Sequence, residues 1–204
     1  TALEGARDIL MERFAETADL LAVLRTRLWD QGVLASTVMK DKETAEEEKF
    51  RDYYAYTESI KTIPSHRALA LFRGRTLGVL KLELGLGEAL DKVVPHPCVS
   101  TIAAHAGIED RGRLADKWLA GVCEWTWRVK MHLQISTELL VQLREAAEAE
   151  AIKIFARNLH ELLLASPAGP KVILGLDPGI RTGCKVAVVD ATGNAYVGNF
   201  GFDL

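Results

Sequence analysis

The stretch ILGLDPGIRTGCKVAVVD, residues 173–190, decides how the last part of the chain folds. One apolar run leads into Asp177, Pro178 and Gly179, and a second apolar run ends at Asp190. Short apolar runs that are bounded by turn residues are typical of strands. Asp177 therefore stands at the end of a strand, where it can act as a metal ligand, as part of a phosphate-binding loop, or as a turn former.

A metal role for Asp177 requires further carboxylates beside it. Mg²⁺ prefers oxygen ligands, and two-metal phosphodiester chemistry draws several carboxylates from different strands. Only Asp190 is nearby in sequence, and an antiparallel pairing of the two runs puts it about a strand length from Asp177. The residues given therefore do not supply the acidic set that a nuclease needs.

The phosphate alternative rests on Gly179, Thr182, Gly183 and Lys185, which lie in or near the turn between the two runs. Backbone amides of such a turn can hold an anion. However, the spacing is not that of a Walker motif, and no helix follows to add its dipole. An actin-like nucleotide site has a comparable Asp and Gly loop but needs a second one, which the sequence lacks. Taken alone, the residues leave the metal, phosphate and turn readings open.

The composition limits the class of protein. The 204 residues are 49% hydrophobic and 26% charged with a net charge of -3, which excludes a strongly basic chain but allows a local basic patch. Three cysteines without CxxC spacing argue against a zinc ribbon or a disulfide framework and fit a reducing cytoplasm. The five histidines have no metal-binding spacing, and no apolar run is long enough to cross a membrane.

Helical periodicity dominates the first 165 residues. We expect helices over 3–29, with Gly32 as the stop, and over the charged run 40–49 as a solvated face. A further helix starts at Pro64 and Ser65, stops at Gly74 and is followed by a strand over 77–84. Residues 95–97 form a break, and residues 114–164 form at least two helices. Within them Trp125 is expected in the core and Trp127, which is off-phase, partly exposed.

After a Pro- and Gly-rich linker at 166–170 the period changes. Three short strands are predicted over 172–176, 185–189 and 195–199, and a hairpin turn over 190–194 joins the last two. The chain is therefore a mostly α domain followed by the opening of an α/β domain.

A basic segment in the middle of the chain is a candidate nucleic-acid interface. Its members are Lys61, His66, Arg67, Arg73, Arg75 and Lys81. Guanidinium groups match phosphates, and the nearby Tyr53, Tyr54 and Tyr56 have rings on which bases can stack. The alternative is structural: Arg67 and Arg73 pair with the acidic run at 46–48.

Four stretches stand out by their order and spacing: ARDILMERFAE (6–16), DYYAYTESIKTIPSHRALALFRGR (52–75), ADKWL with WTWRVK (115–130), and ILGLDPGIRTGCKVAVVD (173–190). Together they resemble the bacterial Tex family of transcription accessory proteins, over essentially the whole chain. The resemblance implies that residues 1–168 belong to a central helical scaffold and that residues 171–204 are the first strands of a YqgF-type RNase H-like domain.

The resemblance also implies a function. Tex proteins are large and cytoplasmic, and they bind nucleic acid. By that pattern the chain is a scaffold segment without catalysis or cofactor, with Lys61, Arg67, Arg73, Arg75 and Lys81 as nucleic-acid contacts. RNA or single-stranded nucleic acid would bind through the full-length parent, which would also meet the transcription or translation machinery, and no membrane is involved.

Asp177 takes a particular meaning from the resemblance. In related resolvase-like domains the matching aspartate belongs to a metal-binding set, which Tex-type domains lack in part, so here it implies a vestigial site or a turn former. The alternative is a metal-dependent nuclease or Holliday-junction-resolvase-like domain that uses Asp177. Three or more acidic side chains converging on Asp177 would favour the enzyme.

The number of strands predicts a fragment. An RNase H-like sheet has five strands, and this sequence supplies three. We therefore expect the 204 residues to be part of a longer protein. A partial sheet leaves a strand edge unpaired, so we also expect self-association through that edge.

Overall fold

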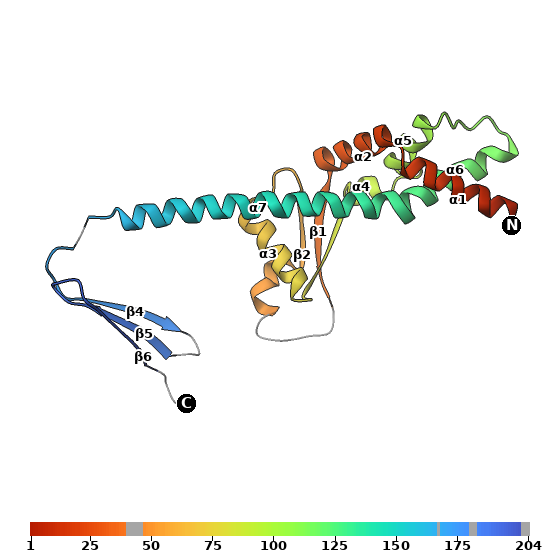
Figure 1. The fold of residues 1–204 in the computed structure, drawn as a ribbon. Coiled ribbons are helices and arrows are strands. Elements are labelled where there is room, and N and C mark those ends of the chain that lie inside the picture. The colour runs from red at the N-terminus through yellow and green to blue at the C-terminus, as the bar shows by residue number, and fades with distance from the viewer. Residues whose placement is uncertain (40–46, 167, 180–182, 201–204) are drawn as a thin grey trace. The chain divides into compact units, whose positions relative to one another are not determined.

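The computed structural model describes residues 1–39, 47–166, 168–179 and 183–200, and its contacts divide the chain into two compact units (Figure 1). The first unit is Thr1–Phe155 and the second is Ala156–Leu204. Most of the predicted helix at 40–49 lies outside the described residues, and the segment that follows is the 3-10 helix η1 (Glu47–Tyr53).

Helices and strands follow one another in the first unit, whereas the second holds strands after the end of α7. The α-helices are α1 (Ala2–Ala15), α2 (Ala18–Gln31), α3 (Ser65–Thr76), α4 (Glu88–Asp91), α5 (Pro97–His105), α6 (Leu114–Thr126) and α7 (His132–Leu163). The strands are β1 (Val33–Val38), β2 (Ala55–Ser59), β3 (Leu80–Gly85), β4 (Ile173–Gly179), β5 (Gly183–Val189) and β6 (Ala195–Phe200). The fold class predicted from the sequence is confirmed: a mostly helical part precedes a small antiparallel sheet.

The first predicted helix is two helices. The helical pattern breaks after α1, where the hydroxyl of Thr17 donates to the carbonyl of Arg13 at 2.8 Å, and α2 starts at once. Leu20, Leu24 and Leu28 of α2 are buried at a spacing of four residues, which marks the face that packs into the core. The helix stops at Gly32, as the sequence predicts.

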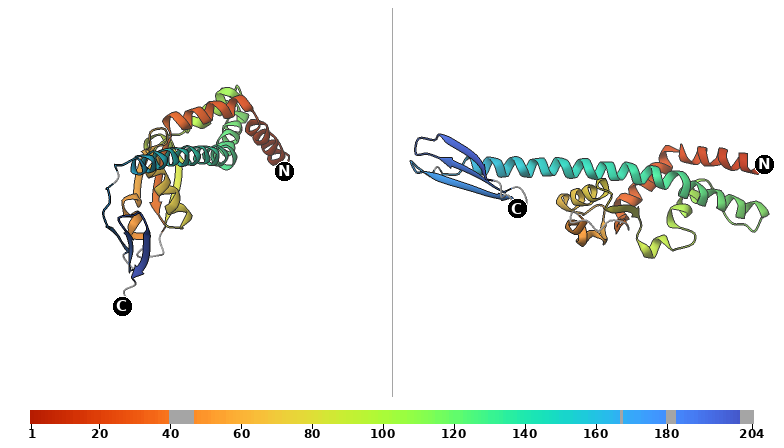
Figure 2. Two further views of the ribbon diagram at one scale, coloured as in Figure 1. Left: turned by 60° about the vertical axis from the view of Figure 1, so that its left-hand side comes forward. Right: turned by 90° about the horizontal axis from the view of Figure 1, so that it is seen from below.

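A three-stranded antiparallel sheet of order β2-β1-β3 lies between the helices, and only β3 is predicted from the sequence. In β1 the side chains of Leu34 and Ser36 are buried, whereas their neighbours are less so. The buried hydroxyl of Ser36 donates to the carbonyl of Tyr53 at 2.6 Å, which satisfies it. The strands and α3 lie on one side of α7 in Figure 1 and in the left view of Figure 2.

The end of α3 corrects one sequence prediction. Gly74 is not a stop, because the helix continues to Thr76. A Cβ at Gly74 would lie 2.5 Å from the side chain of Leu80, so glycine is there to let α3 approach β3 closely. The left-handed residue that ends the helix is Gly78, with φ of 72°. Its backbone N–H and that of Val79 donate back to the last turn of α3.

The long helical segment corrects a second prediction. The expected division between two helices occurs at η2 (Trp127–Met131), which is π-helical rather than a loop. A π turn inserts an extra residue and shifts the phase of the helix. Trp127 is 5% exposed and Trp125 is 44% exposed, the reverse of the expectation, because Trp127 continues the buried face of α6 four residues after the buried Cys123. From Met131 onward the buried face of α7 recurs every four residues, through Ile135 and Leu139.

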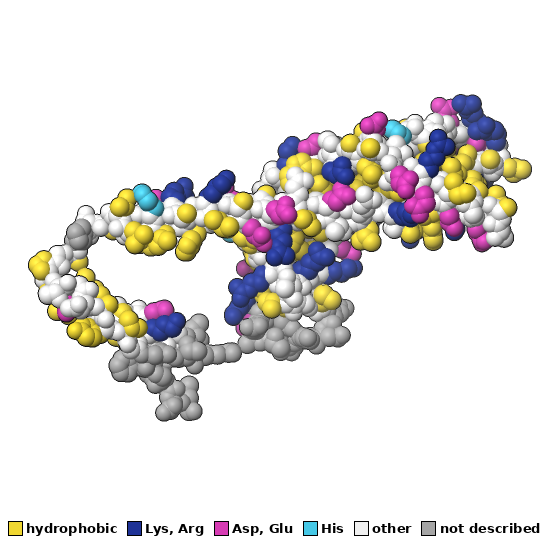
Figure 3. Space-filling model, viewed as in Figure 1, with side chains coloured by type: hydrophobic (Ala, Val, Ile, Leu, Met, Phe, Trp, Pro, Cys, Tyr) yellow, Lys and Arg dark blue, Asp and Glu magenta, His cyan; other side chains and the backbone are white. Residues whose placement is uncertain are grey.

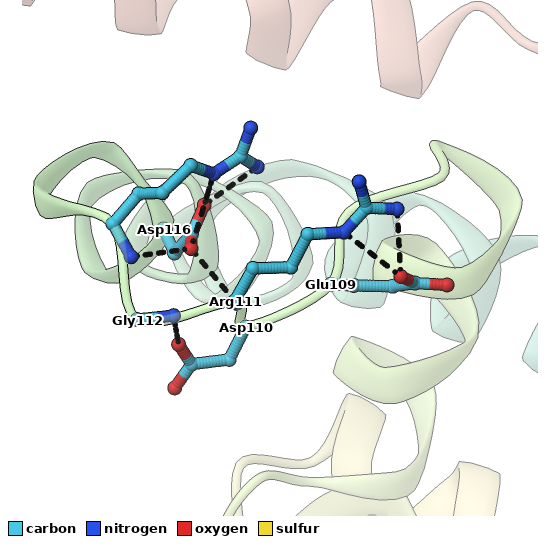
Figure 4. A network of polar contacts seen from close by, with 6 residues as sticks. Glu109, Asp110, Arg111, Gly112 and Asp116 are labelled. Carbon is cyan, nitrogen blue, oxygen red and sulfur yellow. Dashed lines mark hydrogen bonds and ion pairs between the residues drawn. The ribbon is translucent and has the colours of Figure 1, made fainter.

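A carboxylate organises the loop before α6 (Figure 4). Asp116 is 2% exposed, and it accepts hydrogen bonds from the backbone N–H groups of Arg111 and Arg113 at 2.8 and 2.9 Å. The guanidinium of Arg113 binds the same carboxylate at 2.8 Å. These contacts, led by the Arg113 side chain, lower the pKa of Asp116 from 3.8 to about 2. Asp116 therefore fixes the start of α6 in its ionised form.

The second unit confirms the three strands predicted in sequence. They form an antiparallel sheet of order β4-β5-β6, so β4 and β6 are the edges of the described sheet. The predicted turn between β5 and β6 is held by Asp190, whose carboxylate accepts hydrogen bonds from Thr192 and Asn194. Apolar side chains of β4, such as Leu174 and Leu176, are exposed. Self-association through a strand edge stays a prediction.

Asp116→Asn is expected to lower the free energy of unfolding at pH 7, because the ionic part of the cap is lost. Since the folded-state pKa lies below the ordinary value, the contribution of Asp116 is complete above about pH 4 and is lost as the pH falls toward 2. Urea unfolding at a series of pH values checks both effects. Glu109→Gln is the control, because Glu109 only pairs with the exposed Arg111. If the free energy of unfolding depends on pH in the same way for both variants, this role of Asp116 is contradicted.

Candidate nucleic-acid interface

The basic segment predicted from the sequence lies on β2, α3 and β3 of the first unit. Lys61 follows β2, Arg67 lies in the first half of α3, Arg73 and Arg75 lie in its last turn, and Lys81 lies on β3. Figure 3 shows Lys and Arg side chains gathered over this part of the unit, next to α7. The five residues lie on neighbouring elements, but Lys61 follows the end of β2 that pairs with Val33, whereas Lys81 lies opposite Thr37 near the other end of β1.

Two of these cations are already paired at the surface. Lys61 binds Asp30 at 2.8 Å, and Lys81 binds Glu83 at 2.7 Å. All four side chains are about half exposed, so solvent screens both pairs and each contributes little to stability. A phosphate can displace such a carboxylate at low cost, but neither lysine is a preformed anion site.

Arg67 is held in a network between α3 and β2. Its guanidinium binds Glu58 at 3.1 Å and the hydroxyl of Tyr56 at 3.3 Å, and that hydroxyl donates to the other oxygen of Glu58. Burial raises the pKa of Tyr56, and the hydrogen bond to Glu58 raises it further. The sequence suggested that Arg67 pairs with the acidic run at 46–48, but in the structure it binds Glu58. Arg67 therefore joins α3 to the sheet.

Arg73 and Arg75 differ from the other three. Both are exposed, and within the residues that the structure describes neither has an ion-pair partner. They lie in the last turn of α3, where positive charge also interacts favourably with the helix dipole. That gives them a structural role, worth about 0.3–1 kcal/mol for an exposed charge. Their guanidinium groups nevertheless stay available to phosphate.

The tyrosines beside the basic segment are held by the core. Tyr53 and Tyr56 meet edge to face with ring centroids 5.4 Å apart. Tyr53, Tyr54 and Tyr56 are all partly buried and pack against the hydrophobic core of the first unit. Their rings serve first as packing groups, so base stacking on them stays a prediction.

Asp177 lies on β4 directly opposite Lys185 of β5. Asp190 follows the far end of β5, where Val189 pairs with Ile173, so the two carboxylates stand at opposite ends of the hairpin. The carboxylate of Asp190 accepts hydrogen bonds from residues of the turn that it begins, and these hydrogen bonds lower its pKa. Among the described residues no group of three or more His, Cys, Asp or Glu side chains is placed to hold a metal ion. Thr182, from the predicted phosphate loop, lies outside these residues.

A cluster that sequence reasoning missed lies at the other end of β3. The ring of Trp127 stacks on His96 with centroids 5.5 Å apart and contacts His132 at 5.2 Å. Nδ1 of His96 accepts from the N–H of Cys98 at 3.1 Å, so Nε2 carries the proton toward Asp91, also at 3.1 Å. The π turn at Trp127 has no simple sequence signal, which is why spacing did not reveal this cluster.

Cys98 and Cys123 are buried and carry free thiols. Burial raises the pKa of Cys98 to about 12 and that of Cys123 to about 11. Both thiols therefore stay protonated at neutral pH, and a protonated thiol is a poor nucleophile.

Comparison with known families decides the assignment of the chain. The family described as "Tex central region-like" matches residues 1–155, which is the whole first unit. The chain belongs to the Tex family. The family described as "Tex protein YqgF-like domain" matches residues 171–200, which contain β4, β5 and β6. The Tex resemblance of the four sequence stretches is thus confirmed.

Curated Tex relatives are much longer than these 204 residues. "Protein tex" of Bordetella pertussis is 55% identical over 197 residues, and "Transcriptional accessory protein Tex" of Neisseria gonorrhoeae is 47% identical over 194. Each alignment covers 94% of the chain and 25% of the relative. "S1 RNA-binding domain-containing protein 1" of Homo sapiens is 27% identical over 92% of the chain and 19% of its own length. The chain thus spans about a quarter of the bacterial proteins.

Replacing Glu58 tests the network around Arg67. Glu58→Gln is expected to lower the pKa of Tyr56 relative to the native chain, because the acceptor that favours the neutral hydroxyl loses its charge. The pKa should remain above the ordinary value of 10.0, since burial persists. Carbon-13 NMR of ring-labelled tyrosine measures this shift. Glu83→Gln is the matched control and should leave the pKa of Tyr56 unchanged. If Glu58→Gln also leaves the pKa of Tyr56 unchanged, the hydrogen bond between Tyr56 and Glu58 is absent in solution.

Proposed function

We propose that this chain is a scaffold segment of a cytoplasmic, nucleic-acid-binding transcription accessory protein, without catalysis of its own. The observation that carries the proposal is the match of the whole first unit to the Tex central region, together with relatives named for transcription and for RNA binding. On this proposal residues 1–168 are the helical scaffold and residues 171–204 open the YqgF-type RNase H-like domain.

The scaffold contributes its own phosphate contacts through Arg73 and Arg75. They are the exposed cations of the basic segment that have no carboxylate partner in the described part of the chain. Arginine offers phosphate a planar fork of donors and stays charged at any relevant pH. Contacts of this kind position a nucleic acid without reading its sequence. With a net charge of -3 on the chain, binding should be local and sensitive to salt.

The partners of the parent protein follow from the same family. RNA or single-stranded nucleic acid is the proposed ligand, since the human relative is named for an S1 RNA-binding domain. The transcription or translation machinery is the proposed protein environment, since the Neisseria relative is named a transcriptional accessory protein. Among the described helices none is long and apolar enough to cross a membrane.

Binding of the chain to single-stranded RNA and to duplex DNA across a salt series tests the contact. We expect the affinity to fall steeply with salt, and Arg73→Ala with Arg75→Ala to reduce the single-strand slope by about 1.4, which corresponds to two lost phosphate contacts. Fluorescence anisotropy with labelled oligonucleotides gives the slopes.

Arg144→Ala is the matched control, because Arg144 is an exposed arginine on α7 that pairs with Glu148. It removes one positive charge without touching α3 and should leave the slope almost unchanged. No binding at low salt would mean that this segment is architecture alone. Equal losses from Arg144→Ala would mean that the binding is unspecific.

The absence of catalysis has its own test at Asp177. Incubation of the chain with Mg²⁺ or Mn²⁺ and labelled RNA, duplex DNA or a four-way junction should give no cleavage above background. The reason is that a two-metal reaction needs several converging carboxylates, whereas Asp177 faces Lys185. Cleavage that requires the metal and is lost in Asp177→Asn would replace the scaffold proposal with the nuclease alternative.

A further inference from the structure

The sheet of the first unit has an open edge at β3, because the strand order is β2-β1-β3. In an antiparallel sheet the backbone groups of successive residues point to opposite neighbours. Val38 N–H donates to the carbonyl of Tyr54, which immediately precedes β2, at 3.1 Å. Met39 N–H donates to the carbonyl of Val79, just before β3, at 2.9 Å. Even-numbered residues of β1 therefore bond to β2, and odd-numbered residues bond to β3.

The register carries this alternation across to β3. Thr37 lies opposite Lys81, and Ala35 lies opposite Glu83, so the odd residues of β3 bond to β1. The backbone groups of Leu82 and Leu84 then point away from the sheet, toward the open edge. The side chain of His132 agrees with this direction, because its Nε2 lies 2.7 Å from the carbonyl of Leu84 and donates to it.

Side chains form hydrogen bonds with the backbone groups at one end of this edge but not with those in its middle. His132 occupies the carbonyl of Leu84, and the carboxylate of Asp91 accepts from the N–H of Leu86 at 2.9 Å. Across the residues that the structure describes, the N–H and C=O of Leu82 and the N–H of Leu84 have no hydrogen-bond partner. The open edge of β3 thus has two free N–H donors and one free C=O acceptor, arranged as a further β-strand would need them.

A cleft of about 1450 Å³ runs beside these groups. It follows β3 and the residues after it from Lys81 to Asp91, and it extends over parts of β1 and β2. Its other walls come from α6, η2, α7 and the loop before α5. Trp127, Leu133 and Leu140 give it an apolar lining. The hydroxyl of Ser136 also lines it, buried and without a hydrogen-bond partner within the described chain. The open edge of β3 therefore borders a cleft whose lining can contact both apolar and polar groups of a bound molecule.

The charge of the cleft argues against nucleic acid as its occupant. Its lining has four cationic side chains, Arg75, Lys81, Lys117 and Arg128, and four carboxylates balance them. A phosphate backbone needs a clear positive excess, which this lining lacks. A neutral polypeptide backbone, by contrast, supplies the acceptors and donors that the edge requires.

The geometry points to a binding site for an extended peptide segment of a partner protein, which pairs with β3 as a fourth strand. Its backbone would accept from the N–H groups of Leu82 and Leu84 and donate to the C=O of Leu82. Alternate side chains would turn toward Trp127 and Leu133, and the others toward solvent. Pairing stops at Leu84, because His132 already holds its carbonyl. The site therefore takes a short strand in one register.

The test starts from a random dodecapeptide library displayed on phage and selected against the 204-residue chain. Amide hydrogen exchange of the nitrogen-15-labelled chain is then measured with and without the best synthetic peptide. We expect exchange at Leu82 and Leu84 to slow by roughly tenfold or more on binding. Methylation of the peptide nitrogen that donates to Leu82 should weaken binding by roughly five- to tenfold, the effect of one net hydrogen bond.

A matched pair of proline variants tests the edge itself. Leu82→Pro removes an outward N–H, a position where an edge strand tolerates proline, and it should weaken peptide binding by roughly five- to tenfold through the loss of one net hydrogen bond. Ala55→Pro is the control, because Ala55 is exposed, lies opposite Thr37 with its backbone facing the outer edge of β2, and does not line the cleft. It should leave the affinity unchanged. If Leu82→Pro fails to fold by circular dichroism, the methylated peptide still decides the question.

Three outcomes would overturn the proposal. One is that no peptide is enriched, and another is that the enriched peptides bind while exchange at Leu82 and Leu84 stays unchanged. The third is that light scattering shows a dimer in which these two amides are already protected without peptide. In that last case the edge pairs with a second copy of the chain.

Discussion

The hydrogen bond from His132 to the carbonyl of Leu84, with the ring of Trp127 packed beside it, is the contact on which the first unit depends. It joins the long helical segment to the sheet at one point, 48 residues apart in sequence. Trp127 begins the π turn Trp127–Met131, and His132 follows that turn directly. His96 stacks on the same tryptophan and holds Asp91 at the end of that strand. Helix, sheet and loop are thus fixed together.

The polar groups at the surface of the first unit differ in whether the fold gives them a partner. Arg67 is hydrogen-bonded to Tyr56 and Glu58, whereas Arg73 and Arg75 remain exposed at the end of α3. Cations without carboxylate partners suit phosphate, and a strand edge with a neutral lining suits a peptide backbone. The two proposed surfaces lie on the same unit, so the proposals for nucleic acid and for a peptide segment can be tested separately on one chain.

Much of the fold could be read from the sequence, and the failures have physical causes. The strands around Asp177 were predictable because turn residues bound short apolar runs, and Pro64 marked the start of α3. Strands β1 and β2 were missed because their sequences, VLASTV and AYTES, do not alternate apolar with polar residues, and one buried position of β1 is Ser36. Residues 95–97 were taken as a break, and helix α5 was not predicted, although its first residue, Pro97, is of a type favoured at that position.

The sequence by itself determined the order of helical and strand regions, the family and the five cations of the basic segment. Only the tertiary structure decided which of those cations are engaged, because Glu58, Asp30 and Glu83 meet them through folding and pairing that spacing does not show. It also decided which tryptophan is buried, because Trp127 continues the buried face that includes Cys123, whereas Trp125 lies off that face. Both positions are apolar in the sequence, and only tertiary packing selects the face of the helix that is buried.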